Sequence, residues 1–336
     1  MTTSAANCPP TEGTNNIGER MRLVLDRHLI IDTDCGIDDA LAIMLALSLP
    51  TSVEAVTCVS GNTDVDSVCE NVLRVLHLCR RSEIPVYRGC EQPLGEPYGT
   101  AHHYHGTDGI GGASEEYPTG DGLMDTTHAA LRLVSMAKQD PGKYTLVLLG
   151  PVTNAAVALS LEPKFTKNLK DIFVLGGNIE GRGNVTPGAE YNFRADPEAA
   201  HVLLSRAECP ITIVPWEAVC RSSIPWDVYE EMCCQDTAKG KFFKAITRHT
   251  LTYHDEVSSE GYQVGDALAI VAALVPDAVT ESKKARVAVE LFGTYTRGQL
   301  VQAWTPDLLP TVKRTVDIAA RFDSALLSEL LVRMLV

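Results

Sequence analysis

Apolar residues along this chain fall into two alternating patterns. Short runs rich in β-branched residues are typical of buried strands, and between them apolar residues recur at the three- and four-residue spacing of helices. The strand-like runs are HLIIDTD, VEAVTCVSG, IPVYRG, YTLVLLGP, DIFVLGG, ITIVPW and RVAVELFGTY, and the helix-like ones include DDALAIMLALS, DVDSVCENVLRVLHLCR, THAALRLVSMAK and DPEAAHVLLSRA. This alternation predicts an α/β fold with a mostly parallel central sheet and helices on both faces.

The pattern also indicates a simple domain organisation. No internal repeat, low-complexity tract or long linker divides the sequence, so we expect a flexible tail over residues 1–27 and a single α/β domain over residues 28–336. Two Gly-rich segments, 98–112 and 176–192, are longer than the usual βα connection of about 2 to 6 residues. Loops that follow the carboxyl ends of parallel strands are where α/β proteins build their sites, so both segments are candidates.

Composition and charge limit the classes of partner. The 336 residues carry a formal net charge of −14 with no cluster of Lys and Arg, which disfavours nucleic acid and anionic membranes as partners. No apolar run approaches the roughly 20 residues of a membrane helix, and the N-terminal stretch has no apolar signal core. The ten cysteines form no CxxC pair and no zinc-like spacing. We therefore expect a cytoplasmic protein with reduced thiols.

The stretch LIIDTDCGIDDALAIMLAL concentrates negative charge beside the predicted core. It places Asp32, Asp34, Asp38 and Asp39 between a predicted strand and a predicted helix. One or two of these carboxylates could cap the helix or complement its dipole. Four in one tight turn would raise one another's pKa unless a cation offset their charge. Carboxylate oxygens favour a hard divalent cation, so the stretch predicts a metal site.

Two known acidic motifs resemble this stretch in part. An EF-hand is excluded because Gly36 stands at the fifth loop position rather than the sixth, and Ile43 stands where the bidentate Glu is required. A strand followed by DxD also begins the aspartyl-phosphate phosphatases. A metal-dependent phosphotransferase therefore remains an alternative at this point.

Several motifs together resemble the nucleoside hydrolases, the inosine-uridine-preferring nucleoside N-ribohydrolase family. DTDCGIDDALAI is similar to the family's N-terminal signature, DxDxGxDDAxA. Three later segments match in the same order, VSGN ending at Asn62, GPVTNAA from Gly150 and GNVTPGAEYNFRADPEAA from Gly183, and HGTDGIGG from His105 is a weaker match. The resemblance implies a nucleoside hydrolase-like domain with a Rossmann-like core. It also implies Ca²⁺-dependent hydrolysis of the N-glycosidic bond of ribonucleosides to free base and ribose.

The resemblance further implies which residues hold the ion and perform the reaction. Ca²⁺ would be bound by Asp34, Asp39, Asp266 and the main-chain oxygen of Leu149, an all-oxygen set that suits this cation. Asp34 would be the general base that activates the metal-bound water for attack through an oxocarbenium-like transition state. The substrate-binding residues implied by the family are Asp38, Asn62, His105, Asn184, Glu190, Asn192 and Asp266.

The sequence departs from the family at the position that assists the leaving base. Well-known members have a histidine or a tryptophan immediately before the last metal aspartate, whereas this chain has Gly265. Tyr262 is a candidate to stack on the base or to hydrogen-bond to it, and His254 and Glu256 are further candidates. Without a general acid, a purine can still leave if stacking makes N7 more basic. Purine nucleosides such as inosine and guanosine are therefore favoured as substrates.

Two other functions remain open from the sequence. A non-catalytic relative could keep the metal and ribose ligands and bind nucleosides without turnover. The metal-dependent phosphotransferase lacks support from any phosphate loop or basic clamp in the sequence. The family resemblance also implies a homodimer or a homotetramer.

Overall fold

The structure, a computed structural model, describes residues 26–251 and 261–336. Its strands are β1 (His28–Thr33), β2 (Ser52–Cys58), β3 (Val86–Arg88), β4 (Met124–Asp125), β5 (Tyr144–Leu148), β6 (Asp171–Leu175), β7 (Ile211–Val214), β8 (Val279–Ala285), β9 (Val287–Val289), β10 (Leu300–Gln302) and β11 (Val316–Phe322). Its α-helices are α1 (Ile37–Ser48), α2 (Val65–Leu78), α3 (His102–His105), α4 (Ala129–Gln139), α5 (Thr153–Leu161), α6 (Tyr191–Ala195), α7 (Pro197–Arg206), α8 (Trp216–Cys220), α9 (Trp226–Cys233), α10 (Ala238–Thr247), α12 (Ala267–Leu274) and α13 (Ser324–Met334). Short 3₁₀ helices are η1 (Phe165–Asn168), η2 (Arg248–Thr250), η3 (Pro276–Ala278) and η4 (Pro306–Leu308).

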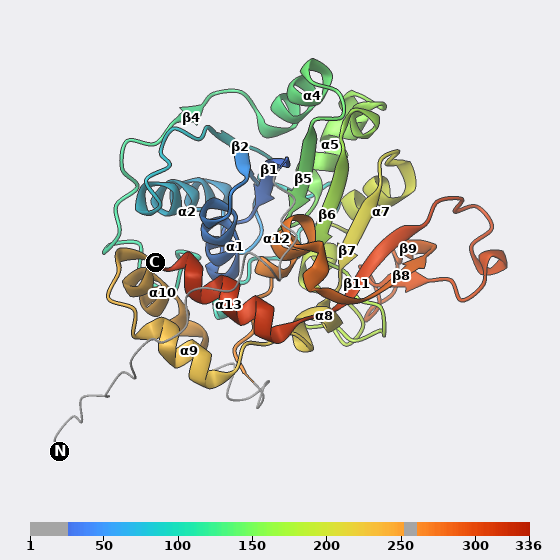
Figure 1. Cartoon of the computed structure of the whole chain (residues 1–336). Coiled ribbons are helices and arrows are strands. Elements are labelled where there is room, and N and C mark those ends of the chain that lie inside the picture. The colour runs from blue at the N-terminus through green and yellow to red at the C-terminus, as the bar shows by residue number, and fades with distance from the viewer. Residues whose placement is uncertain (1–25, 252–260) are drawn as a thin grey trace.

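The main sheet has nine strands in the order β4-β3-β2-β1-β5-β6-β7-β11-β8 (Figure 1). All neighbouring strands pair in parallel except β8, which is antiparallel to β11 at one edge. The predicted α/β fold with a mostly parallel sheet is confirmed. Because the strands are parallel, the loops that follow β1, β2, β5, β6 and β7 meet at one edge of the sheet, as expected for a site in this class of fold.

Helices cover both faces of the sheet and bury two separate hydrophobic cores. Successive residues of a strand point to opposite faces, so Ile31 packs with α1, α2, α12 and α13, while Ile30 packs with α4, α5 and α7. Helix α12 is buried along its whole length, and α1 is buried at most of its positions. Both helices begin beside acidic residues of the predicted site. Their burial holds their first turns in place against the core.

One of the four aspartates in the acidic stretch serves the fold. The Oδ2 of Asp32 accepts hydrogen bonds from Thr57 Oγ1 at 2.5 Å and from Asn154 Nδ2 at 2.8 Å. These bonds tie β1 to β2 and to α5 beneath the loops. Burial raises the pKa of Asp32 to about 7, above its ordinary value.

The region after α12 differs from the sequence prediction. The predicted strand RVAVELFGTY contributes only β9, which pairs with β10 in a separate antiparallel hairpin. Strands β8 and β11, which were not predicted, complete the edge of the main sheet. Five of the seven residues of β8 are exposed, so the apolar pattern that marks buried strands is missing there.

Some sequence predictions concern residues beyond the described part. His254 and Glu256 lie outside it, as does the tail up to residue 25. Arg27 is described, and its Nη1 donates to Asp171 at 2.6 Å and to Thr145 at 2.8 Å, so the chain already contacts the sheet there. No helix in the described ranges has the length and apolar character needed to cross a membrane.

Candidate active site

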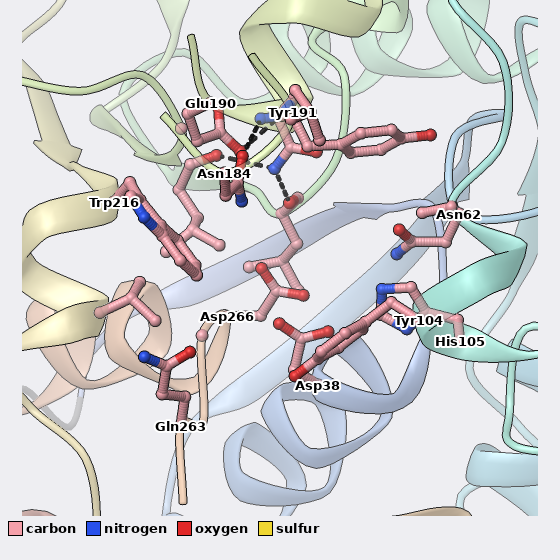
Figure 2. A pocket seen from close by; sticks show the side chains of 18 of the residues that line it. Asp38, Asn62, Tyr104, His105, Asn184, Glu190, Tyr191, Trp216, Gln263 and Asp266 are labelled. Atoms are coloured by element: carbon pink, nitrogen blue, oxygen red, sulfur yellow. Dashed lines mark hydrogen bonds between the residues drawn. The ribbon is translucent and has the colours of Figure 1, made fainter. Parts of the chain in front are cut away.

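A cavity of about 720 Å³ opens at the carboxyl ends of the central strands (Figure 2). This volume is in the range of small-molecule sites. The sequence-predicted residues that line it are Asp34, Asp38, Asn62, His105, Leu149, Asn184, Glu190, Asn192 and Asp266. They come from segments far apart in the sequence, which the parallel sheet brings together.

Three carboxylates form a compact group beside this cavity. Asp38, Asp39 and Asp266 each offer one oxygen, and these oxygens lie within 4.8 Å of one another. Figure 2 shows the side chains of Asp38 and Asp266 directed into the same part of the cavity. Asp39 lies behind the lining, in the first turn of α1, and is completely buried. The group could hold a divalent cation.

Asp34 lies outside this three-residue group but lines the same cavity. Its carboxylate lies against the backbone of Gly61 and Gly150, and its Oδ2 accepts a hydrogen bond from the backbone N–H of Asn62 at 2.8 Å. Gly150 follows the predicted ligand Leu149 directly. The carboxylate is therefore held between the loops that follow β2 and β5.

Hydrogen bonds orient Asp39 strongly. Thr33 Oγ1 donates to its Oδ1 at 2.5 Å, while Gly36 N–H at 2.8 Å and Asn62 Nδ2 at 3.1 Å donate to its Oδ2. Gly36 has no space for a side chain, because a Cβ there would lie 2.5 Å from His105 Nδ1. The glycine thus allows the acidic turn, Asn62 and α3 to pack closely.

The electrostatics of the cavity fit a cation. Burial raises the pKa of Asp34, Asp38, Asp39 and Asp266, and the neighbouring carboxylates raise it further for Asp34, Asp39 and Asp266. Within residues 26–251 and 261–336, no Lys or Arg forms an ion pair with any of them. Oxygen donors with unbalanced negative charge are the ligands that Ca²⁺ and Mg²⁺ prefer.

The main-chain oxygen of Leu149 faces one of the predicted ribose ligands. Asn192 Nδ2 donates to this oxygen at 2.7 Å and to the Leu175 carbonyl at 3.1 Å. A carbonyl oxygen has two lone pairs, so this bond leaves one for another partner. The amide of Asn192 is held in place by the ends of β5 and β6.

Glu190 and Asn184 are held by the loop that precedes α6. Glu190 caps this short helix, since its Oε1 accepts from Asn192 N–H and its Oε2 accepts from Phe193 N–H and from Gly177 N–H. Burial raises the pKa of Glu190 to about 7. Asn184 is exposed at the mouth of the cavity, and its Oδ1 accepts from Tyr191 N–H at 2.9 Å.

His105 is positioned as a neutral hydrogen-bond donor. Its Nδ1 accepts from the backbone N–H of Ile37 at 3.0 Å, which assigns the ring proton of the neutral form to Nε2. Burial lowers the pKa of His105 to about 4, so the imidazole is uncharged near neutral pH. The ring lines the cavity, as the HG motif predicts.

Tyr262 does not line the cavity, contrary to the sequence prediction. Its ring is 1% exposed and stacks on Tyr229 with 4.8 Å between the ring centroids. Its hydroxyl lies 3.0 Å from Thr250 Oγ1. In the extended segment before α12 neighbouring side chains alternate, so Gln263 lines the cavity instead.

Gly265 cannot carry a side chain in this arrangement. A Cβ at this position would lie 2.1 Å from Asp38 Oδ2, and the backbone φ of +25° already disfavours other residues. The chain therefore replaces the expected histidine or tryptophan with a residue that leaves space for the Asp38 carboxylate.

The structure adds aromatic lining residues that the sequence prediction missed. Trp216 begins α8 directly after β7 and Pro215, and Tyr104 precedes His105 in α3; both line the cavity (Figure 2). Because Trp216 follows a predicted parallel strand almost directly, the sequence could have identified it as a candidate lining residue. Aromatic faces at this edge could stack on a planar ligand.

Comparisons with known proteins agree with this geometry. The family model for inosine-uridine preferring nucleoside hydrolases matches residues 29–329. The non-specific ribonucleoside hydrolase RihC of Salmonella newport (strain SL254) is 34% identical over 275 residues, which cover 82% of this chain and 87% of that protein. Among solved structures, the plant nucleoside hydrolase PpNRh1 superposes with a TM-score of 0.84 at 30% identity, covering 92% of this chain and 99% of that chain. An inosine-guanosine nucleoside hydrolase also reaches 0.84, at 32% identity and with coverages of 92% and 98%.

These matches decide between the alternatives that the sequence left open. They extend over nearly the whole described domain and include the acidic stretch, so they decide against a phosphotransferase. The chain therefore belongs to the inosine-uridine preferring nucleoside hydrolase family, and it is a nucleoside N-ribohydrolase.

Proposed function

We propose that the protein uses Ca²⁺ to hydrolyse the N-glycosidic bond of ribonucleosides, with purine nucleosides as its preferred substrates. The observation that carries this proposal is a group of three carboxylates, two buried and one half-buried, beside a cavity of nucleoside size and without Lys or Arg partners among the described residues. Asp34, Asp39, Asp266 and the Leu149 oxygen would hold the ion, and the carboxylate of Asp38 lies within 4.8 Å of those of Asp39 and Asp266. When bound, the ion supplies Lewis acidity that lowers the pKa of a water molecule.

Asp34 is the general base in this mechanism. Its carboxylate lines the cavity, and the backbone N–H of Asn62 fixes one oxygen. In the metal-free protein, burial and the nearby carboxylate of Asp39 raise its pKa. A cation bound beside Asp34 would favour its ionised form, which is the form that accepts a proton. Asp34 takes the proton of the attacking water, and the oxygen of that water forms the new bond to the anomeric carbon as the bond to the base breaks.

The remaining polar residues bind and stabilise the sugar. Ribose hydroxyls donate to the carboxylates of Asp38, Asp266 and Glu190 and to the amide oxygen of Asn192, while Asn184 lies at the mouth of the cavity. Fixed oxygens around the ring favour the positive charge that develops in an oxocarbenium-like transition state. Asn62 and His105 hold the acidic turn in place, and His105 offers its Nε2–H to the substrate.

The proposed preference for purines rests on the aromatic lining of the cavity and on Gly265. Trp216 and Tyr104 supply aromatic surface, and Gly265 supplies no general acid. A stacked purine can accept a proton at N7 from solvent, whereas a pyrimidine has no equivalent ring nitrogen. The inosine-guanosine hydrolase is named for purine substrates, while RihC is named as non-specific, so relatives of both kinds exist.

The test is release of free base from inosine, guanosine, adenosine, uridine and cytidine in phosphate-free buffer. We expect the highest kcat/KM for inosine or guanosine, loss of activity with EGTA and recovery with Ca²⁺. Asp34→Ala is expected to lower kcat by at least about 10³-fold, because it removes the general base. Asp236→Ala, at an exposed carboxylate, is the matched control and should leave kcat unchanged.

Other outcomes would revise the proposal in specific ways. A larger kcat/KM for uridine than for inosine would overturn the purine preference. Binding of Ca²⁺ and ribose without release of any base would indicate a protein that recognises nucleosides and does not cleave them. We also propose a cytoplasmic homodimer or homotetramer, which size-exclusion chromatography with light scattering would test.

A further inference from the structure

The segment that leads into α12 places one unused polar group in the cavity. Tyr262 is anchored to Ile224 by two backbone hydrogen bonds of 2.8 and 2.9 Å, and its side chain points into the aromatic core. The next residue, Gln263, consequently points the other way. Figure 2 shows its carboxamide directed into the cavity, on the segment that reaches Asp266.

The carboxamide of Gln263 faces the cavity and has no partner in the described protein. The residue is only 8% exposed, yet neither its amide nitrogen nor its amide oxygen makes a hydrogen bond with residues 26–251 or 261–336. The fully buried amides of Asn71, Asn154 and Asn178 behave differently, since all three donate to backbone carbonyls. An amide that reaches the cavity and makes no hydrogen bond to the protein leaves its donors and its acceptor available to a ligand.

The lining of the cavity that Gln263 faces fits a planar heterocycle. The same cavity is lined by Trp216, Tyr104 and Val219, which offer aromatic and apolar surface. Gly265, two residues further on, adds no side chain. A carboxamide offers two N–H donors and one acceptor, which matches a base edge that presents a ring N–H or amino group beside a carbonyl or ring nitrogen.

We propose that Gln263 hydrogen-bonds to the nucleobase and is a specificity-determining residue for the leaving group. This inference rests on the proposed function and assigns the base end of the same cavity. The electron pair of the glycosidic bond leaves with the base, and the Nε2–H of Gln263 donates to an acceptor atom of that base. The amide itself loses no proton, and the proton that completes the free base comes from water.

The test compares two substrates that share ribose and differ in the leaving group. Inosine has a base edge for Gln263 to bind, whereas p-nitrophenyl β-D-ribofuranoside has a good leaving group without one. In Gln263→Met, which keeps the length of the side chain, we expect kcat/KM for inosine to fall roughly 10- to 100-fold, mainly through kcat. The value for the nitrophenyl riboside should change by less than about threefold, because no hydrogen bond is lost.

A matched control perturbs the same segment from its other side. Thr250→Val removes the hydroxyl that contacts Tyr262 and leaves the cavity lining unchanged. It should lower the melting temperature without altering the ratio of kcat/KM values for the two substrates. If Gln263→Met reduced both substrates equally, or neither, the carboxamide would not recognise the base.

A binding measurement separates this inference from the proposed function. If the wild type cleaves neither substrate, the proposed hydrolysis fails, but recognition can still be measured by calorimetry with inosine and with ribose. Gln263→Met should then weaken inosine binding about tenfold or more and leave ribose binding unchanged. Equal effects on both ligands would overturn the inference.

Discussion

At the scale of single residues, the cavity depends on how closely backbone and carboxylates approach one another. Gly36 lies against His105, and Gly265 lies against Asp38. A side chain at either position would displace the predicted substrate-binding residue beside it. The absence of a side chain at Gly265 thus has a positive role, because it preserves the position of the Asp38 carboxylate.

Gly265→Ala should therefore reduce activity more than it reduces stability. The added Cβ would lie 2.1 Å from Asp38 Oδ2, so the carboxylate must move away from the ribose. We expect kcat/KM for inosine to fall at least about tenfold, as a displaced hydrogen bond of 1 to 2 kcal/mol implies. Steady-state kinetics and thermal unfolding measure the two effects.

Gly142→Ala is the matched control for this substitution. Gly142 has a positive φ of 79°, and a Cβ there meets no atom within 4 Å. It should cost about 1 kcal/mol of stability through backbone strain and leave kcat/KM unchanged. Equal kinetic effects of the two substitutions would show that backbone strain, not contact with Asp38, causes the loss.

The residue scale also shows where sequence reasoning reached its limit. The family resemblance pointed to the acidic motif and the AEYN segment, and both contribute residues that line one cavity. Tyr262 was predicted to contact the base, but it does not line the cavity, whereas the next residue, Gln263, does. Whether Tyr262 or Gln263 faces the cavity depends on the pairing of Tyr262 with Ile224, a contact between distant residues that no local pattern records.

At the scale of elements, strand ends determine which side chains meet. Strands β1, β5, β6 and β7 were predictable from their continuous apolar runs, because both faces of a parallel sheet are buried. The edge strand β8 was not predictable, since most of its side chains are exposed. The sequence pattern does not predict that β11 pairs with both β7 and β8, because this pairing depends on tertiary contacts.

Trp216 provides a prediction at this scale, because it stands where β7 passes into α8. Trp216→Leu keeps an apolar side chain but removes the flat surface on which a base can stack. We expect kcat/KM to fall about tenfold for inosine and less for uridine, because aromatic stacking on a base contributes roughly 1 to 3 kcal/mol and the purine has the larger face.

Trp304→Leu is the corresponding control for Trp216→Leu, since Trp304 is 92% exposed and is not part of the cavity lining. Its kinetic constants should equal those of the wild type for both substrates. Equal losses for inosine and uridine in Trp216→Leu would argue that the indole supports the loop and does not contact the base.

At the scale of the whole molecule, buried carboxylates couple stability to pH. The pKa values of Asp32 and Glu190 rise to about 7, and burial also raises those of Asp34, Asp38, Asp39 and Asp266. The unfolded chain ionises these groups near pH 4, so the folded state binds more protons between pH 4 and pH 7. The stability that Asp32 and Glu190 contribute is complete below about pH 4 and is lost as the pH rises through about 7, and the other four carboxylates act in the same direction.

We therefore expect the metal-free protein to become less stable as the pH rises from 5 to 8. His105 acts in the opposite direction, because its lowered pKa adds stability as the pH rises through 6.5, but the carboxylates outnumber it. In EGTA, the free energy of unfolding from urea titration should fall by about 2 kcal/mol or more across this range. With excess Ca²⁺ the fall should largely disappear, because a cation that binds only the ionised folded state stabilises it by mass action. A metal-free protein that is equally stable at both pH values would contradict this coupling, and Mg²⁺ at the same concentration tests whether the stabilisation is specific for Ca²⁺.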